Sequence, residues 1–177
     1  AQEVKSEAVT ENRTLADEIV SAVLGGNGLI LVSSDEADKR VEMRYKLCER
    51  LGGNYSIIVV DDPAGSFLEL LVKIAKAAGM KPNDPKDREK ILLELITAAD
   101  ERASGGRPIL LVIDVVEKMF PATFERLMLD LANDAVTAKK RMQLVLFGSA
   151  EFRKIMDKEN RNHEVMEPDL VFDLQIK

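Results

Sequence analysis

Three short apolar segments of the chain are each followed by side chains that could bind a ligand. Lys39 and Arg40 are cations suited to a phosphate, Asp114 could hold a metal ion, and Ser149 could donate a hydrogen bond. Each has a structural interpretation too, because cations close to carboxylates form solvated local pairs and an aspartate after a strand commonly caps a turn. We expect the structural interpretations to hold.

The other reactive side chains give little support for catalysis or metal binding. The single Cys48 allows no intrachain disulfide and no cysteine zinc cluster, and its place on an apolar helix face predicts a core residue. The single His163 allows no paired-histidine metal site. One compact basic run, Lys139-Lys140-Arg141, follows a predicted helix. We therefore interpret it as a helix C-terminal cap, and a weak nucleic-acid patch is the less favoured interpretation.

Composition narrows the class of protein. The chain has 177 residues, 46% of them hydrophobic and 32% charged, which is typical of one globular domain. Its 25 Lys and Arg against 31 Asp and Glu give a net charge of −6, which disfavours a broad nucleic-acid surface. No apolar run approaches the roughly 18–20 residues that span a bilayer, so we expect no membrane insertion by this segment.

The apolar pattern alternates between strand and helix periods along the chain. No two-residue hairpin turn separates the strands, which predicts an α/β fold with a parallel sheet and helices on both faces. We expect one domain over residues 1–177, with residues 1–13 as a polar N-terminal extension. The five predicted strands are 29–32, 56–60, 109–113, 143–147 and 170–176.

Three stretches resemble the core of P-loop ATPases of the AAA type, closest to the ExeA-like proteins of general secretion and the TniB-like proteins of transposition. Residues 111–114, followed by Pro121 and an apolar helix, resemble the Walker B strand and its next helix. Residues 144–153 resemble the sensor strand and loop, and 54–63 the second strand and its turn. The resemblance implies a three-layer P-loop NTPase-like fold with strand order 5-1-4-3-2. The family's helical lid after the last strand is absent.

The first loop departs from the phosphate-binding pattern G-x-x-x-x-G-K-[ST], in which glycines wrap the phosphates and lysine and hydroxyl bind phosphate and Mg²⁺. The matching positions are Ser34, Lys39, Arg40 and Val41. Both glycines are missing, the lysine is arginine and the hydroxyl is valine. Because non-glycine residues avoid positive φ, we expect this segment to enter its helix early. Three carboxylates within it would also repel phosphates: Asp35, Glu36 and Asp38.

The hydrolytic positions are altered as well. Asp114 stands where the family keeps its metal-associated aspartate, but the next position, where the family has a water-activating glutamate, is Val115. Valine cannot accept a proton. Ser149 occupies the sensor region. We therefore expect these positions to be vestigial, with no catalytic residue and no bound cofactor.

These observations predict a cytoplasmic pseudo-ATPase module that binds a protein partner, and the resemblance implies secretion, envelope assembly or transposition as its setting. It could also be the soluble domain of a larger or membrane-anchored protein. One alternative is an atypical ATPase that binds ATP and Mg²⁺ with Lys39 and Arg40. Another is a nucleic-acid-handling accessory protein. Met119 and Phe120, if both were exposed, would form an apolar patch for a partner. The oligomeric state stays open.

Overall fold

The computed structural model describes residues 3–6, 14–132, 142–152, 154 and 170–174. They contain one sheet of six parallel strands in the order β1-β6-β2-β5-β4-β3. The predicted order of five strands is therefore confirmed: β2 and β4 are separated by β5. Among the described residues, no helical lid follows β6. The strands are β1 (Glu3–Ser6), β2 (Leu29–Ser33), β3 (Ser56–Val60), β4 (Ile109–Ile113), β5 (Gln143–Gly148) and β6 (Leu170–Asp173).

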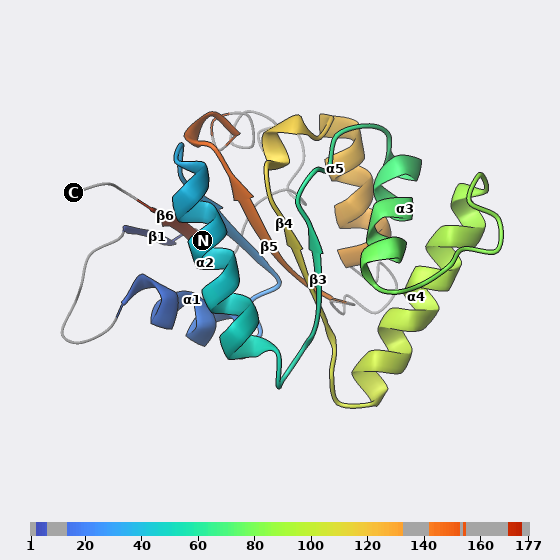
Figure 1. The fold of residues 1–177 in the computed structure, drawn as a ribbon, viewed down its shortest axis with the longest axis horizontal. Coiled ribbons are helices and arrows are strands. Elements are labelled where there is room, and N and C mark those ends of the chain that lie inside the picture. The colour runs from blue at the N-terminus through green and yellow to red at the C-terminus, as the bar shows by residue number, and fades with distance from the viewer. Residues whose placement is uncertain (1–2, 7–13, 133–141, 153, 155–169, 175–177) are drawn as a thin grey trace.

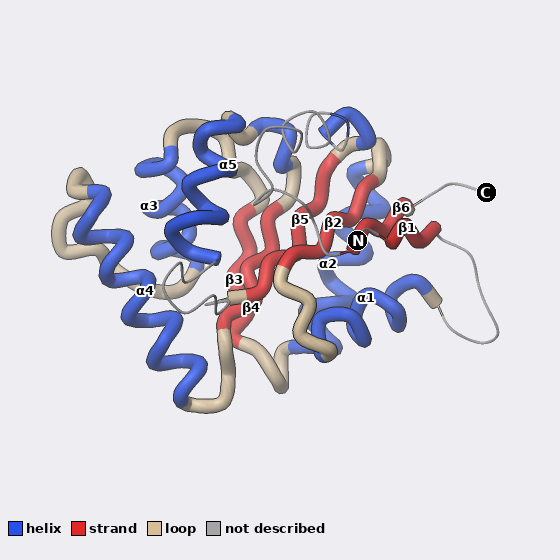
Figure 2. The backbone as a smooth tube through the Cα atoms, turned by 180° about the vertical axis from the view of Figure 1, so that it is seen from behind, coloured by secondary structure: helices blue, strands red, loops and turns tan. Residues whose placement is uncertain are grey.

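In the described part of the chain, α-helices cover both faces of the sheet (Figures 1 and 2). One face packs against α1 and α2, and the other against α3, α4 and α5, so each face has its own apolar cluster. This is the three-layer arrangement that the sequence predicts. The helices are α1 (Leu15–Leu24), α2 (Ala37–Leu51), α3 (Phe67–Ala77), α4 (Arg88–Ser104) and α5 (Pro121–Leu127).

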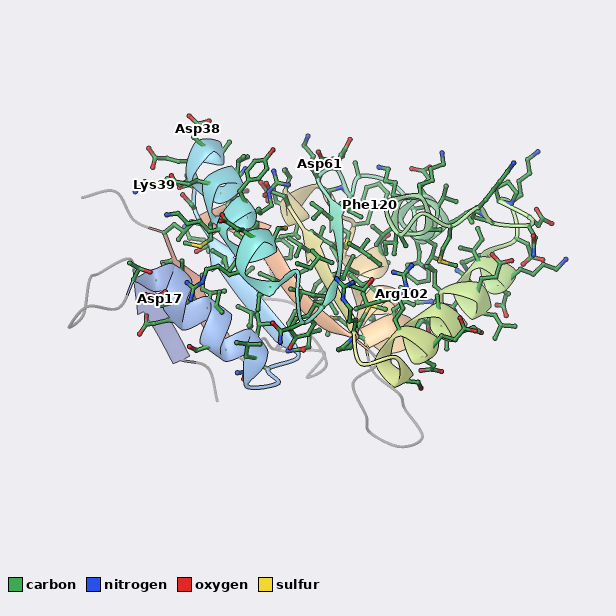
Figure 3. The ribbon with its side chains drawn as sticks, turned by 60° about the horizontal axis from the view of Figure 1, so that its bottom comes forward. Asp17, Asp38, Lys39, Asp61, Arg102 and Phe120 are labelled. Carbon is green, nitrogen blue, oxygen red and sulfur yellow. The ribbon has the colours of Figure 1, made fainter. Side chains whose placement is uncertain are left out.

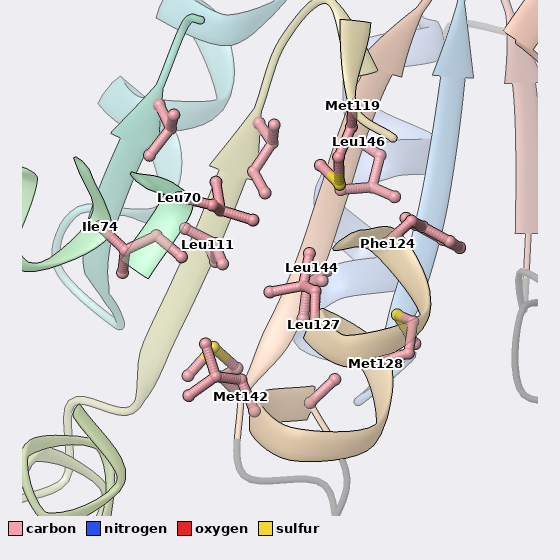
Figure 4. Packing of buried hydrophobic residues seen from close by; sticks show 14 of the residues in the cluster. Leu70, Ile74, Leu111, Met119, Phe124, Leu127, Met128, Met142, Leu144 and Leu146 are labelled. Atoms are coloured by element: carbon pink, nitrogen blue, oxygen red, sulfur yellow. The ribbon is translucent and has the colours of Figure 1, made fainter. Parts of the chain in front are cut away.

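The interior strand β4, between β5 and β3, is buried along its whole length because both faces are covered. Leu111 faces the cluster under α3 and α5 (Figure 4), whereas Val112 faces the cluster under α1 and α2. Neighbouring β5 alternates in the same way, with Leu146 on the first side and Val145 on the second. This double burial fixes the ends of β4 and β5, from which the loops of the candidate site begin.

Strand β1 lies within residues 1–13, for which the sequence predicts only a polar extension. Glu3 to Ser6 pair in parallel with β6, in the register Glu3 to Leu170. The interpretation was wrong for these four residues. A short polar strand at the rim of a sheet is formed by backbone pairing, so an apolar pattern does not reveal it.

Helix α4 begins at Arg88, although Asp84 followed by Pro85 is a typical helix start. The carboxylate of Asp84 accepts a hydrogen bond from the backbone N–H of Lys86 at 3.1 Å, which closes a local turn around Pro85. Asp87 is the N-cap instead, and its carboxylate accepts from the backbone N–H of Lys90 at 3.2 Å. Two aspartates compete as caps here, and the second one begins the helix.

Candidate functional site

The loops after β2, β4 and β5 meet at the carboxyl-terminal edge of the sheet, where α/β proteins bind ligands. The loop after β2 is short, because the chain leaves the strand at Ser33 and enters α2 at Ala37. This confirms the expected early entry into the helix. No residue between Ser34 and Arg40 has a positive φ.

The polar groups of Ser34 are turned toward the protein. Its backbone N–H donates to the carbonyl of Gly148 at 2.9 Å, and its hydroxyl accepts from the backbone N–H of Glu36 at 3.1 Å. Its carbonyl oxygen accepts from Nη1 of Arg40 at 2.6 Å. A phosphate loop directs backbone N–H groups at the anion. Here Ser34 directs a carbonyl oxygen at a cation, so the polarity of the loop is opposite to that of a phosphate loop.

Arg40 is the cation at the centre of the site. Its Nε lies 2.9 Å from Oδ1 of Asp114, and the side chains of the two residues are only 8% and 5% exposed. Arg44, one turn further along α2, brings its Nε to 3.2 Å from Oδ2 of the same carboxylate. The backbone N–H of Val115 also donates to Oδ1 at 2.7 Å. We call Arg40, Arg44 and Asp114 the arginine–aspartate cluster.

This cluster corrects the expectation that Arg40 belongs to a solvated group of local charges. Its partner comes from β4 instead, and the pair is almost completely buried. Lys39, the neighbouring cation, lies 3.9 Å from Glu36 at the outer side of α2 (Figure 3). Val41 is half-buried in the same helix. Of the two predicted phosphate-binding cations, the structure therefore brings only Arg40 to Asp114.

Val115 has a left-handed backbone, with φ 55° and ψ 42°. A β-branched residue is rarely found there, because its Cβ crowds the following carbonyl. The carboxylate of Asp114 accepts the N–H of Val115, and a single 3₁₀ turn, η1 (Val116–Lys118), follows. The tight turn after β4 thus bends around the arginine–aspartate cluster.

The loop after β5 is held by backbone contacts that the sequence analysis missed. The backbone N–H of Ser149 donates to the carboxylate of Glu117 at 3.2 Å. The carboxylate of Asp35 accepts from the N–H of Ala150 at 3.1 Å, so one of the three loop carboxylates caps the segment after β5. A Cβ added to Gly148 would lie 2.7 Å from Cγ2 of Val116, which shows how closely this loop and η1 approach.

Several other predicted features have definite positions. Cys48 is half-buried in α2, and burial raises the pKa of its thiol. Met119 is buried and only Phe120 is exposed, so the two do not form the apolar patch considered above. The basic run Lys139-Lys140-Arg141 and the single His163 lie outside the described residues.

No described helix is long and apolar enough to cross a membrane. No group of three metal-ligating side chains occurs among the residues described.

A family model described as "AAA domain" matches residues 11–156. The chain therefore belongs to this family of AAA domains. No curated protein sequence matches it.

Solved structures share the fold at low sequence identity. Cdc6p from Pyrobaculum aerophilum is similar with a TM-score of 0.67 at 14% identity, over 93% of this chain and 46% of that one. The ORC2 protein of Aeropyrum pernix, in its ADP form, is similar with a TM-score of 0.62 at 12% identity, over 90% of this chain and 46% of its own. The chain thus spans about half the length of these structures, and the likeness concerns the fold.

Proposed function

We propose that this AAA domain is a pseudo-ATPase that acts through protein contacts and does not hydrolyse nucleotide. The observation that carries the proposal is the position of Arg40. Its guanidinium bridges the carbonyl of Ser34 and the carboxylate of Asp114, so the chain's own cation occupies the space between the first loop and the end of β4.

The electrostatics of the arginine–aspartate cluster support this proposal. Asp114 is already neutralised by two guanidinium groups, and its Oδ1 accepts hydrogen bonds from Arg40 and from the backbone N–H of Val115, so Mg²⁺ would compete with these partners. Separating a buried ion pair costs about 3–5 kcal/mol, which binding of a metal–nucleotide complex would have to offset.

The residue at position 115 disfavours hydrolysis independently of the arginine–aspartate cluster. Val115 offers no carboxylate to orient or deprotonate a water, and its side chain cannot exchange protons. Positioning and charge stabilisation supply most of the catalysis in phosphoryl transfer, and one missing cation such as an arginine finger costs about 10³–10⁵ in rate. The same proposal treats four further positions as vestigial parts of a nucleotide site: Ser34, Lys39, Val41 and Ser149.

The biological setting rests on the resemblance to ExeA-like and TniB-like ATPases. It favours a module of secretion, envelope assembly or transposition machinery with a protein partner. The cytoplasmic location stays a prediction. A role in nucleic-acid handling would depend on Lys139, Lys140 and Arg141, which lie outside the described residues.

One observation favours a second function, which is nucleotide binding without hydrolysis. The arginine–aspartate cluster contains two cations and one anion, so it carries an excess positive charge close to the start of α2. A polyphosphate that displaced the carboxylate of Asp114 could bind both Arg40 and Arg44. The ORC2 structure to which this fold is similar is described as an ADP form.

Calorimetric titration with ATP and ADP in the presence of Mg²⁺ tests the two functions. The pseudo-ATPase proposal predicts no saturable heat, no rise in melting temperature and no phosphate release above the buffer. Saturable binding that Arg40→Ala abolishes and Arg107→Ala preserves would instead establish the second function. Phosphate release that the same Arg40→Ala change abolishes would overturn the pseudo-ATPase proposal.

A further inference from the structure

Among the described strands, β3 is the last on its side of the sheet and has only β4 as a neighbour. The backbone N–H of Ser56 donates to Pro108, and the carbonyl of Val60 accepts from Asp114, so residues 56, 58 and 60 point their backbone groups at β4. Alternation along the strand then directs the N–H and C=O groups of Ile57 and Val59 away from the sheet. These four groups form an open edge, which can pair with another strand.

The side chains along this edge are also incompletely covered. Ile58 and Val60 are buried under α3, whereas Ile57 and Val59 lie on the α2 face and remain half-buried. Figure 1 shows β3 between α2 and α3 at this end of the sheet. The edge therefore combines unpaired backbone groups with two β-branched side chains that have apolar surface left to bury.

The two ends of β3 carry opposite charges. Asp61, directly after the strand, is exposed, and no cation pairs with it among the described residues (Figure 3). At the other end, Nη2 of the exposed Arg107 donates to the carbonyls of Gly52 and Tyr55 at 2.5 and 3.1 Å. No carboxylate in the described part of the chain pairs with this guanidinium. The edge is therefore acidic where it ends and basic where it begins.

We propose that β3 pairs antiparallel with β3 of a second copy of the chain, about a two-fold axis at Ile58, to form one continuous sheet. An antiparallel arrangement brings the acidic end of each copy to the basic end of the other. It is thus complementary to itself, as a two-fold interface requires. The inference goes beyond the proposed function and holds whether or not nucleotide binds.

The directions of the backbone groups define the register. Only residues with outward N–H and C=O groups can form hydrogen-bonded pairs, and a two-fold axis at Ile58 places Ile57 opposite Val59 of the other copy. The two such pairs use all four open backbone groups within the strand. Each also brings together two β-branched side chains, a favourable cross-strand pair.

The same register accounts for the charges. It places Asp61 opposite Tyr55 of the other copy, whose carbonyl is the group that Arg107 binds. The carboxylate and guanidinium then meet across the interface. An unrelated extended peptide could use the same backbone groups, but nothing would give it these charges at this spacing, so we choose the second copy as the occupant.

Sedimentation equilibrium over a concentration series, combined with amide hydrogen exchange, tests the proposal. We expect a monomer–dimer equilibrium in which the Ile57 and Val59 amides gain protection as concentration rises, while the Ile58 amide is protected throughout. Val59→Lys should abolish the dimer, because a charge on an edge strand opposes pairing. Leu93→Lys, at an exposed position of α4, is the matched control and should leave it intact. A monomer at every concentration, or a dimer insensitive to Val59→Lys, would overturn the proposal.

A charge exchange separates this register from other modes of dimerisation and does not depend on one variant folding. Asp61→Lys alone should weaken the dimer at least several-fold, because two like charges then meet at each end. Adding Arg107→Glu to that variant should restore the association. Equal dissociation constants for the wild type and Asp61→Lys, with normal circular dichroism, would reject the antiparallel register.

Discussion

Arg40 and Asp114 connect the segments that follow β2 and β4, two strands of the sheet that are not neighbours. Arg40 lies in the first turn of α2, which follows β2, and Asp114 directly follows β4; β5 lies between β2 and β4 in the sheet. The 2.9 Å contact from Nε to Oδ1 therefore spans the end of the intervening strand. Because Arg44 binds the other oxygen, the carboxylate fixes one side of α2 over the sheet edge.

Replacing Asp114 by asparagine should strongly destabilise the fold. The change conserves shape but leaves Arg40, with its 8% exposed side chain, as a buried cation without an anion. Removing one partner of a buried pair costs about 3–5 kcal/mol. Urea denaturation measures this loss. Asp100→Asn, at an exposed position of α4, is the control, and a loss as small as its own would contradict the role of the cluster.

Arg40→Met should destabilise the domain by less than Asp114→Asn, because Arg44 still neutralises the carboxylate. The carbonyl of Ser34 loses its partner, a cost of about 1–3 kcal/mol. The double variant should lose less stability than the two single losses added together, with a coupling of about 0.5–3 kcal/mol. Additive losses in urea denaturation would show that the two side chains do not interact.

Val115→Gly should be neutral or stabilising by up to about 1 kcal/mol. Glycine removes the left-handed penalty of about 1–2 kcal/mol, which is partly offset by its greater freedom in the unfolded chain. The matched change Val41→Gly, within helix α2, should instead cost about 1 kcal/mol. Thermal denaturation of both variants measures these two changes in stability. A larger loss for Val115→Gly than for Val41→Gly would show that the valine side chain outweighs its backbone strain.

Gly148→Ala should destabilise the site through the contact between β5 and η1. The new methyl group would lie 2.7 Å from Cγ2 of Val116 and 3.1 Å from Oε2 of Glu117, so the 3₁₀ turn must move. Overpacking of this kind costs about 1–3 kcal/mol. Gly53→Ala has no heavy atom within 4 Å of its new methyl group, and in calorimetry it should melt close to the wild type.

The thiol of Cys48 should react slowly with a disulfide reagent in the folded protein. Burial is the main cause of its raised pKa, and the charge of Arg44 opposes it, so the neutral thiol is favoured. The stabilisation from a raised folded pKa is complete below the ordinary thiol value of about 8.5 and is lost as pH rises through it. Stability should thus fall more steeply above that pH in the wild type than in Cys48→Ser. Parallel curves would contradict this prediction.

The strands of the sheet could be predicted because the apolar pattern of each strand is visible within its own few residues. Segments such as 109–113 are apolar on both faces, which indicates a central parallel strand, and the resemblance added the strand order. The arginine–aspartate cluster was not predictable in the same way. Spacing along a helix reveals neighbours such as Lys39 and Glu36, whereas Asp114 meets Arg40 only after the sheet has formed.

Strand β1 has a consequence for how the chain is made. Glu3–Ser6 leaves the ribosome before the rest of the domain, but its partner β6 is Leu170–Asp173, so nearly all of the domain is synthesised before the two can pair. The inner strands can assemble as they emerge, since domains tend to fold from the N-terminal side during synthesis. Closing β1 onto β6 is then the last step, and until it occurs the nascent protein exposes the edge of β6 to chaperones and to other chains.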